Sequence, residues 1–195
     1  MKRRFLLALC MSVLSVSLFT QPALAAAPTL TIGLIPAEDA QAMLENSKQV
    51  ISSLQDQLGM PVKPFIATDY NGIIEALRAK KLDVAYLGPF SYVLASSVAN
   101  VEAFSVAETK KNGKSFYKSL IIVRKDSGIQ NIEQLKGQTM AFVDPTSASG
   151  HLFPSAGLRK NNIDPNKYFS RVIFSGSHDA SICLLYTSDA ADDMQ

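Results

Sequence analysis

Short apolar runs alternate along the chain with longer segments whose apolar residues recur every three or four positions. The short runs predict buried strands at residues 30–34, 62–67, 83–87, 101–107, 117–124, 139–143 and 171–174. The longer segments predict helices at residues 40–58, 71–80, 89–98 and 150–161, with a short helix at 132–135. Strands that alternate with helices in this way are typical of an α/β fold with a largely parallel sheet.

Residues with defined backbone preferences mark several helix boundaries. Gly59 closes the first helix, and Pro61 prevents its continuation. Thr68 or Asp69 supplies a side-chain oxygen that can cap the second helix. Pro154 is compatible with the helix at 150–161 because it falls in the first turn.

The first 25 residues have the pattern of a secretory leader. Three basic residues at positions 2–4 precede an almost wholly apolar run at 5–19, and Ala23-Leu24-Ala25 is a small-x-small cleavage signal. The apolar run is short for a transmembrane helix. We therefore expect a cleavable signal peptide at 1–25 and a periplasmic protein.

Charge and cysteine content narrow the class of ligand. The 19 basic and 17 acidic residues nearly balance, and three basic ones lie in the leader, which argues against a nucleic-acid partner. Outside the leader the chain has one cysteine, Cys183, and two histidines. These cannot build the common zinc shells, so we expect no metal and no cofactor.

The end of the chain differs in character from the rest. Residues 178–182 begin a helix that residues 184–195 do not continue, and these last residues resemble a translated sequencing adapter. We interpret 183–195 as a non-native tail on a truncated gene fragment. A genuine polar tail is the alternative.

Five strand-to-helix junctions carry small hydroxyl or aromatic residues. They lie at residues 36–39, 68–70, 88–92, 146–151 and 175–178. Ligands of open α/β sheets bind beyond the carboxyl ends of the strands, where helix N-termini point unpaired N–H groups at an anion. The junctions therefore predict an anion site.

The junction that begins at Asp144 is the most informative and allows two interpretations. Thr146, Ser147 and Ser149 offer hydroxyls, and Gly150 leaves the backbone N–H groups accessible, so the loop could surround an oxyanion. Alternatively, Ser147 or Ser149 simply caps the following helix. His178 also allows two interpretations. It is a surface residue, or it is a hydrogen-bond donor whose pKa responds to a bound anion.

Four of these stretches together resemble one family. They are ATDYNG at 67–72, LGPFSY at 87–92, AFVDPTSASG at 141–150 and SGSHDA at 175–180. In this order they resemble the periplasmic phosphonate-binding subunit of phosphate/phosphite/phosphonate ABC transporters, a type II periplasmic binding protein. The resemblance runs from about Thr29 to Ile182.

The resemblance implies a set of ligand-binding residues. A tyrosine of the first lobe, a second tyrosine just before the strand that begins the other lobe, a hydroxyl-rich loop and a histidine would surround the ligand. In this chain they correspond to Tyr70, Tyr117, Ser147, Ala148, Ser149, Gly150 and His178. Ala148 is a departure, because many members have threonine there, and one side-chain hydrogen bond is lost.

The resemblance also implies the fold and the function. We expect a first α/β lobe at residues 28–118 and the opening part of a second at 119–182, each with a mixed, mostly parallel sheet and flanking helices. The expected function is capture of a phosphonate or related oxyanion, phosphite or phosphate, between the lobes of a monomer. The expected partner is the permease of an ABC importer.

Three alternatives remain at this stage. The protein could deliver its ligand to a membrane sensor, or bind a different small molecule. A secreted serine hydrolase is a remote third, because Ser147 or Ser149, a histidine and an aspartate supply the residue types of a catalytic triad without a Gly-x-Ser-x-Gly elbow.

Overall fold

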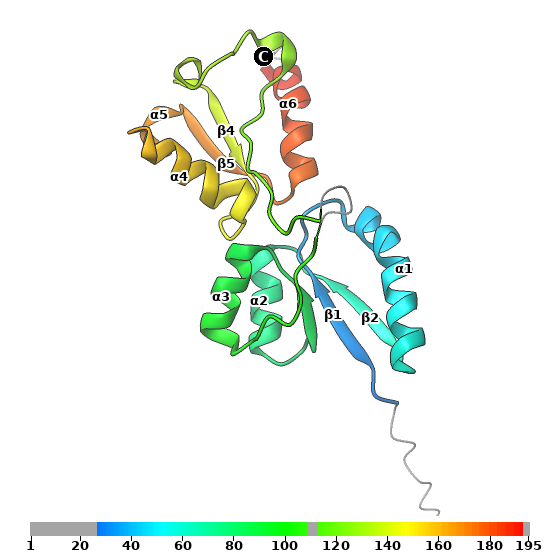
Figure 1. Ribbon diagram of the computed structural model, residues 1–195. Helices are drawn as coiled ribbons and strands as arrows, with labels where there is room; N and C mark the ends of the chain where they lie inside the picture. The colour runs from blue at the N-terminus through cyan, green and yellow to red at the C-terminus, as the bar shows by residue number, and fades with distance from the viewer. Residues whose placement is uncertain (1–26, 109–112, 193–195) are drawn as a thin grey trace, which may run out of the picture.

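The computed structural model describes residues 27–108 and 113–192, which form two α/β units joined by an extended segment (Figure 1). The predicted leader at 1–25 lies outside the described residues. In the first unit three parallel strands pair in the order β2-β1-β3. They and their helices are β1 (Leu30–Leu34), α1 (Ala40–Leu58), β2 (Val62–Ile66), α2 (Tyr70–Arg78), β3 (Val84–Tyr86) and α3 (Pro89–Ala99).

The second unit has a sheet of two parallel strands. Its elements are η1 (Lys125–Ser127), η2 (Ile132–Leu135), β4 (Thr139–Phe142), the π-helical turn η3 (Ala148–Leu152), α4 (Phe153–Lys160), α5 (Pro165–Tyr168), β5 (Arg171–Phe174) and α6 (His178–Asp192). Helices α4 and α5 lie on one side of this sheet and α6 on the other (Figure 1). Among the described residues every strand pairing is parallel, and no helix is both long and apolar enough to cross a bilayer.

The predicted helix boundaries are confirmed at the caps. Asp69 is the N-cap of α2, and its carboxylate accepts the Gly72 N–H at 2.7 Å. Gly59 ends α1 in the left-handed conformation, which costs glycine little because it has no Cβ. Pro154 stands in the first turn of α4. Local chemistry therefore determines where these helices start and stop.

Two apolar clusters form the core. The larger one includes Tyr70, Ile73 and Ile74 of α2, of which Ile73 has no exposed surface. Val143, which follows β4 in the second unit, packs into this same cluster. The smaller cluster centres on Leu158. The contact of Val143 with the first unit brings the loop after β4 against α2.

Two predicted strands are absent. Residues 101–107 and 117–124 are extended, but no backbone hydrogen bond joins them to the strands of the described ranges. Their apolar side chains are largely exposed, with 82% of Phe104 and 74% of Leu120 accessible. Alternating apolar and polar residues suit a segment to a β-sheet. A strand also needs a neighbouring strand with which its backbone can form hydrogen bonds.

The predicted helix break near residue 183 is wrong in this structure. Helix α6 continues from His178 to Asp192 without interruption. Ser177 starts it, with its hydroxyl accepting the Ala180 N–H at 3.1 Å. Alanine, leucine and aspartate are all compatible with a helix once a capped first turn exists, so polarity alone did not stop it.

Candidate functional site

The loops that follow the strands of the two sheets meet each other. The Tyr70 N–H at the start of α2 donates to the carboxylate Oδ2 of Asp144 at 3.4 Å. The Ser91 hydroxyl of α3 donates to the carbonyl of Thr146 at 3.0 Å. The third contact joins the His178 N–H to the carbonyl of Ala37 at 2.8 Å. All five predicted junctions therefore gather at one boundary between the units.

Tyr70 is the most buried of the predicted site residues, with 2% of its surface exposed. Its hydroxyl is hydrogen-bonded to the side chain of Ser147, across the boundary. Burial raises the pKa of Tyr70 to about 12, and the nearby charges of Asp144 and Tyr117 act in the same direction, although the Ser147 hydrogen bond opposes them. The phenol is therefore neutral at physiological pH and can donate a proton in a hydrogen bond.

The loop at 147–150 has the cap that one interpretation of its sequence predicts. Ser147 is the N-cap of η3, and its hydroxyl accepts the Gly150 N–H at 3.1 Å, as the capping interpretation predicts. The Gly150 N–H is therefore already bonded. A Cβ at Gly150 would also collide with the side chain of Val143, so this glycine permits close packing and does not open the loop to a ligand.

The remaining amides of the same turn keep their capacity to bind an anion. Ala148 and Ser149 are the first two residues of η3, where N–H groups precede any intrahelical acceptor. Because η3 leads directly into α4, the helix dipole adds to the attraction at this end. Ala148 is 3% exposed and contributes no polar side chain.

Tyr117 approaches the loop from the extended segment between the units. Burial of its hydroxyl raises the pKa of Tyr117, whereas a hydrogen bond to Ser149 lowers this pKa. Repulsion from the ionised form of Tyr86 raises it further. About half of the whole side chain, 51%, is nevertheless exposed. The Ser119 hydroxyl fixes the same segment by donating to the Ser149 carbonyl at 2.7 Å. Tyr117 thus borders the site.

His151, the other histidine of the chain, is engaged elsewhere. His151 Nδ1 lies 2.9 Å from the Pro145 carbonyl oxygen, and its ring packs edge-on against Phe142 and Phe174. Within the described ranges, neither histidine ring is hydrogen-bonded to a serine hydroxyl, and the ring of His178 makes no hydrogen bond to the six other predicted site residues. The same part of the chain contains no cluster of three potential metal ligands.

Two polar residues were not singled out as site residues from the sequence. Asp144 is 6% exposed, and its Oδ1 accepts both the N–H and the hydroxyl of Thr146 at 2.7 and 2.8 Å. Ser91 has no exposed surface. The available signal was position, because Asp144 stands two residues beyond β4 and Ser91 lies in the first turn of α3, which follows β3.

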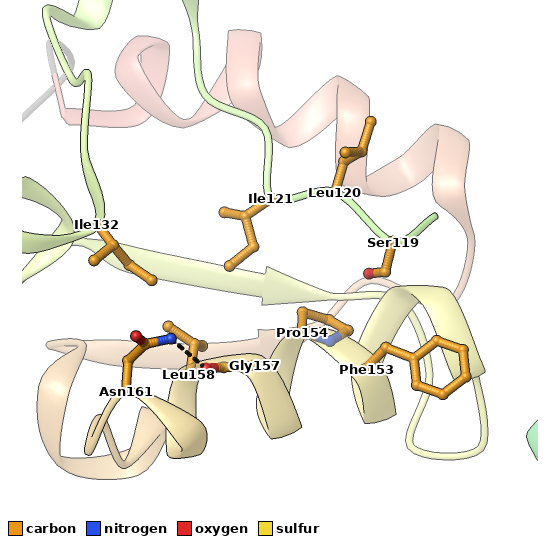
Figure 2. Close-up of a pocket in the computed structure, with 9 residues that line it drawn as sticks. All are labelled: Ser119, Leu120, Ile121, Ile132, Phe153, Pro154, Gly157, Leu158 and Asn161. Carbon is orange, nitrogen blue, oxygen red and sulfur yellow. Dashed lines mark hydrogen bonds between the residues drawn. The ribbon is translucent and has the colours of Figure 1, made fainter. Parts of the chain in front are cut away.

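A pocket beside helix α4 has a different character from these residues. A pocket of about 340 Å³ opens between the segment at 119–121 and helix α4 (Figure 2). Figure 2 shows Ile121 pointing into it toward Leu158, whereas Leu120 points away. Because its lining is mainly apolar, the pocket lacks the directed donors that an oxyanion needs, and we place the candidate site at Tyr70 and the 147–150 loop instead.

The raised pKa of Tyr70 predicts a loss of stability in alkali. The folded-state pKa, about 12, exceeds the ordinary value of 10.0, so the unfolded chain ionises first and the free energy of unfolding falls as pH rises from 10 to 12. Tyr70→Phe cannot ionise, so we expect a shallower fall. Urea unfolding of both proteins at pH 9 and pH 11 measures the difference; equal losses would contradict the assignment.

Comparison with known proteins places this arrangement in a family. A family model described as "ABC transporter, phosphonate, periplasmic substrate-binding protein" matches residues 32–191. The chain is 31% identical over 169 residues to the phosphate-import protein PhnD of Mycolicibacterium smegmatis, covering 83% of this chain and 53% of the relative. It is 34% identical over 152 residues to the phosphonates-binding periplasmic protein of Escherichia coli, covering 75% and 44%.

A solved structure supports the same placement. The binding protein component of an ABC phosphonate transporter from Pseudomonas aeruginosa has a TM-score of 0.75 and 31% identity, covering 85% of this chain and 55% of that one. The chain thus spans about half the length of these relatives. Its two α/β units have the type II periplasmic-binding-protein fold, and the chain belongs to the family of periplasmic substrate-binding proteins of phosphonate ABC transporters.

Proposed function

We propose that this protein captures a phosphonate, or the related oxyanions phosphite and phosphate, between its two lobes and delivers it to an ABC importer. The observation that carries the proposal is the meeting of Tyr70 with Ser147 across the boundary, in a chain of this family. The named relatives are a phosphate-import protein and a phosphonates-binding protein, which supports this class of ligand. The protein acts by binding and is not an enzyme.

The donors at the boundary suit a tetrahedral oxyanion. One hydroxyl of the Tyr70–Ser147 pair, the Ser149 hydroxyl and the amides of Ala148 and Ser149 would direct hydrogen toward the ligand. Each hydrogen bond to a charged group contributes about 1.5–3 kcal/mol. Four or five such bonds, less the cost of desolvation and ordering, are compatible with micromolar affinity, or about −8 kcal/mol.

The remaining predicted residues take supporting roles in the proposal. Tyr117 would cover the ligand from the connecting segment, and Gly150 allows the loop to pack on Val143. His178, half-buried at the start of α6, would reach the ligand through its ring. Because Tyr70 and Ser147 belong to different lobes, a ligand bound to both favours the closed arrangement that a permease would recognise.

Calorimetry of the chain with methylphosphonate, 2-aminoethylphosphonate, phosphite, phosphate and sulfate tests the ligand class. We expect micromolar binding of a phosphonate or phosphite, and a loss of about tenfold or more in Tyr70→Phe, which removes one hydrogen bond to a charged group. Ser155→Ala, a buried serine of α4 outside the boundary, is the matched control and should bind normally.

The calorimetric result can contradict the proposal in two ways. Absence of heat with all five anions from a folded chain would exclude an oxyanion ligand. Binding that Tyr70→Phe leaves unchanged would exclude the site. Preference for sulfate would keep the binding function and change the ligand.

We also propose that the protein works in the periplasm as a monomer after cleavage behind Ala25. The leader pattern supports the cleavage, and the periplasmic family supports the location. Mass spectrometry of the chain expressed in a Gram-negative host should find a periplasmic form that begins at Ala26, and replacement of Ala23 and Ala25 by leucine should prevent processing. A full-length cytoplasmic product from the unaltered chain would contradict the leader assignment.

A further inference from the structure

Thr146 is held through all three of its hydrogen-bonding groups. Its N–H and hydroxyl donate to Oδ1 of Asp144, and its carbonyl accepts from the Ser91 hydroxyl of the other lobe. Asp144 and Ser91 are both buried, at 6% and 0% exposed, so water cannot readily replace these partners. The next residue is Ser147, whose side chain bonds to Tyr70.

Asp144 also reaches the first lobe directly. Its second carboxylate oxygen, Oδ2, accepts the Tyr70 N–H at 3.4 Å, a long contact that nevertheless directs the buried charge at the N-terminus of α2. A role confined to shaping its own loop would need Oδ1 alone. The contacts of Oδ2 and of Ser91 cross the boundary, and neither is required by the turn itself.

We propose that Asp144 and Ser91 are positioning residues that seat the loop at 144–147 on the first lobe and so hold Ser147 opposite Tyr70. The consequence for ligand affinity rests on the proposed function, but the seating of the loop does not. Neither residue needs to touch the ligand. Their effect is to fix the separation of the two hydroxyls that come from different lobes.

Asp144→Asn separates the two roles of the carboxylate. The amide oxygen can keep both short bonds to Thr146, which leaves the amide NH₂ facing the Tyr70 N–H, donor against donor. Ser91→Ala removes the other crossing contact without changing Asp144. Each variant thus removes one of the two hydrogen bonds that hold the 144–147 loop against the first lobe.

The chain offers a close control for each variant. Asp164→Asn alters an aspartate whose Oδ1 also accepts the N–H two residues on, at 3.2 Å from Asn166, but entirely inside the second lobe. Ser97→Ala removes a hydroxyl from the same helix as Ser91, one that donates to the Leu94 carbonyl at 2.6 Å. Each control makes the same substitution as its test variant, aspartate to asparagine or serine to alanine, at a residue whose hydrogen bond stays within one lobe.

Amide hydrogen exchange of the ligand-free chain tests the seat without depending on any ligand. We expect exchange about fivefold to tenfold faster in peptides that cover 68–74 and 144–150 for Asp144→Asn and Ser91→Ala, the change that loss of one hydrogen bond produces. Peptides from β1 and β2, and both control variants, should keep the exchange of the unaltered chain. Unchanged exchange at 68–74, or an equal rise throughout the chain, would overturn the proposal.

Calorimetry with methylphosphonate then tests the consequence for binding. Asp144→Asn and Ser91→Ala should each weaken the affinity about tenfold, and the controls should not. Full affinity in both seat variants would overturn the positioning role. If the unaltered chain itself fails to bind, the proposed function fails, and the exchange measurement still decides whether the seat exists.

Discussion

Hydrogen bonds between buried polar groups hold the two lobes together where the strands of both sheets end. Asp144, Thr146 and Ser147 of one lobe meet Tyr70 and Ser91 of the other. Buried polar groups are costly unless they are paired, so each of these contacts constrains its neighbours. The position of the proposed site, the neutral state of the Tyr70 phenol and the packing of Val143 on the first core all depend on this boundary.

Features determined by local chemistry could be predicted from the sequence. The five paired strands and the caps at Asp69 and Gly59 follow from residues close in the chain, and the structure has them. The grouping of junctions at one edge of each sheet also follows, because carboxyl ends of parallel strands share that edge, but the meeting of the two groups depends on how the two sheets face each other. The individual roles within the gathering do not, because they depend on which distant groups meet. Gly150, for example, permits contact with Val143, and its N–H serves Ser147.

Features that require a distant partner were predicted less well. Residues 101–107 and 117–124 have the composition of strands, but a strand is completed by hydrogen bonds that its own sequence does not contain. Here Phe104 and Leu120 remain largely exposed, and the 340 Å³ pocket opens beside the second of these segments. The chain covers about half the length of its relatives. The pocket is lined mainly by apolar side chains, whereas the boundary carries hydrogen-bonding groups, so the boundary suits an anion better.

We propose that the oxyanion binds between Tyr70 and the 147–150 loop. Two-dimensional amide NMR spectra of the chain with and without methylphosphonate test it most directly, because every amide near the ligand reports separately. We expect the largest shift changes at residues 68–72 and 146–151, with small changes around Leu158 in the apolar pocket. Changes confined to the pocket beside α4, or none at saturating methylphosphonate, would contradict it.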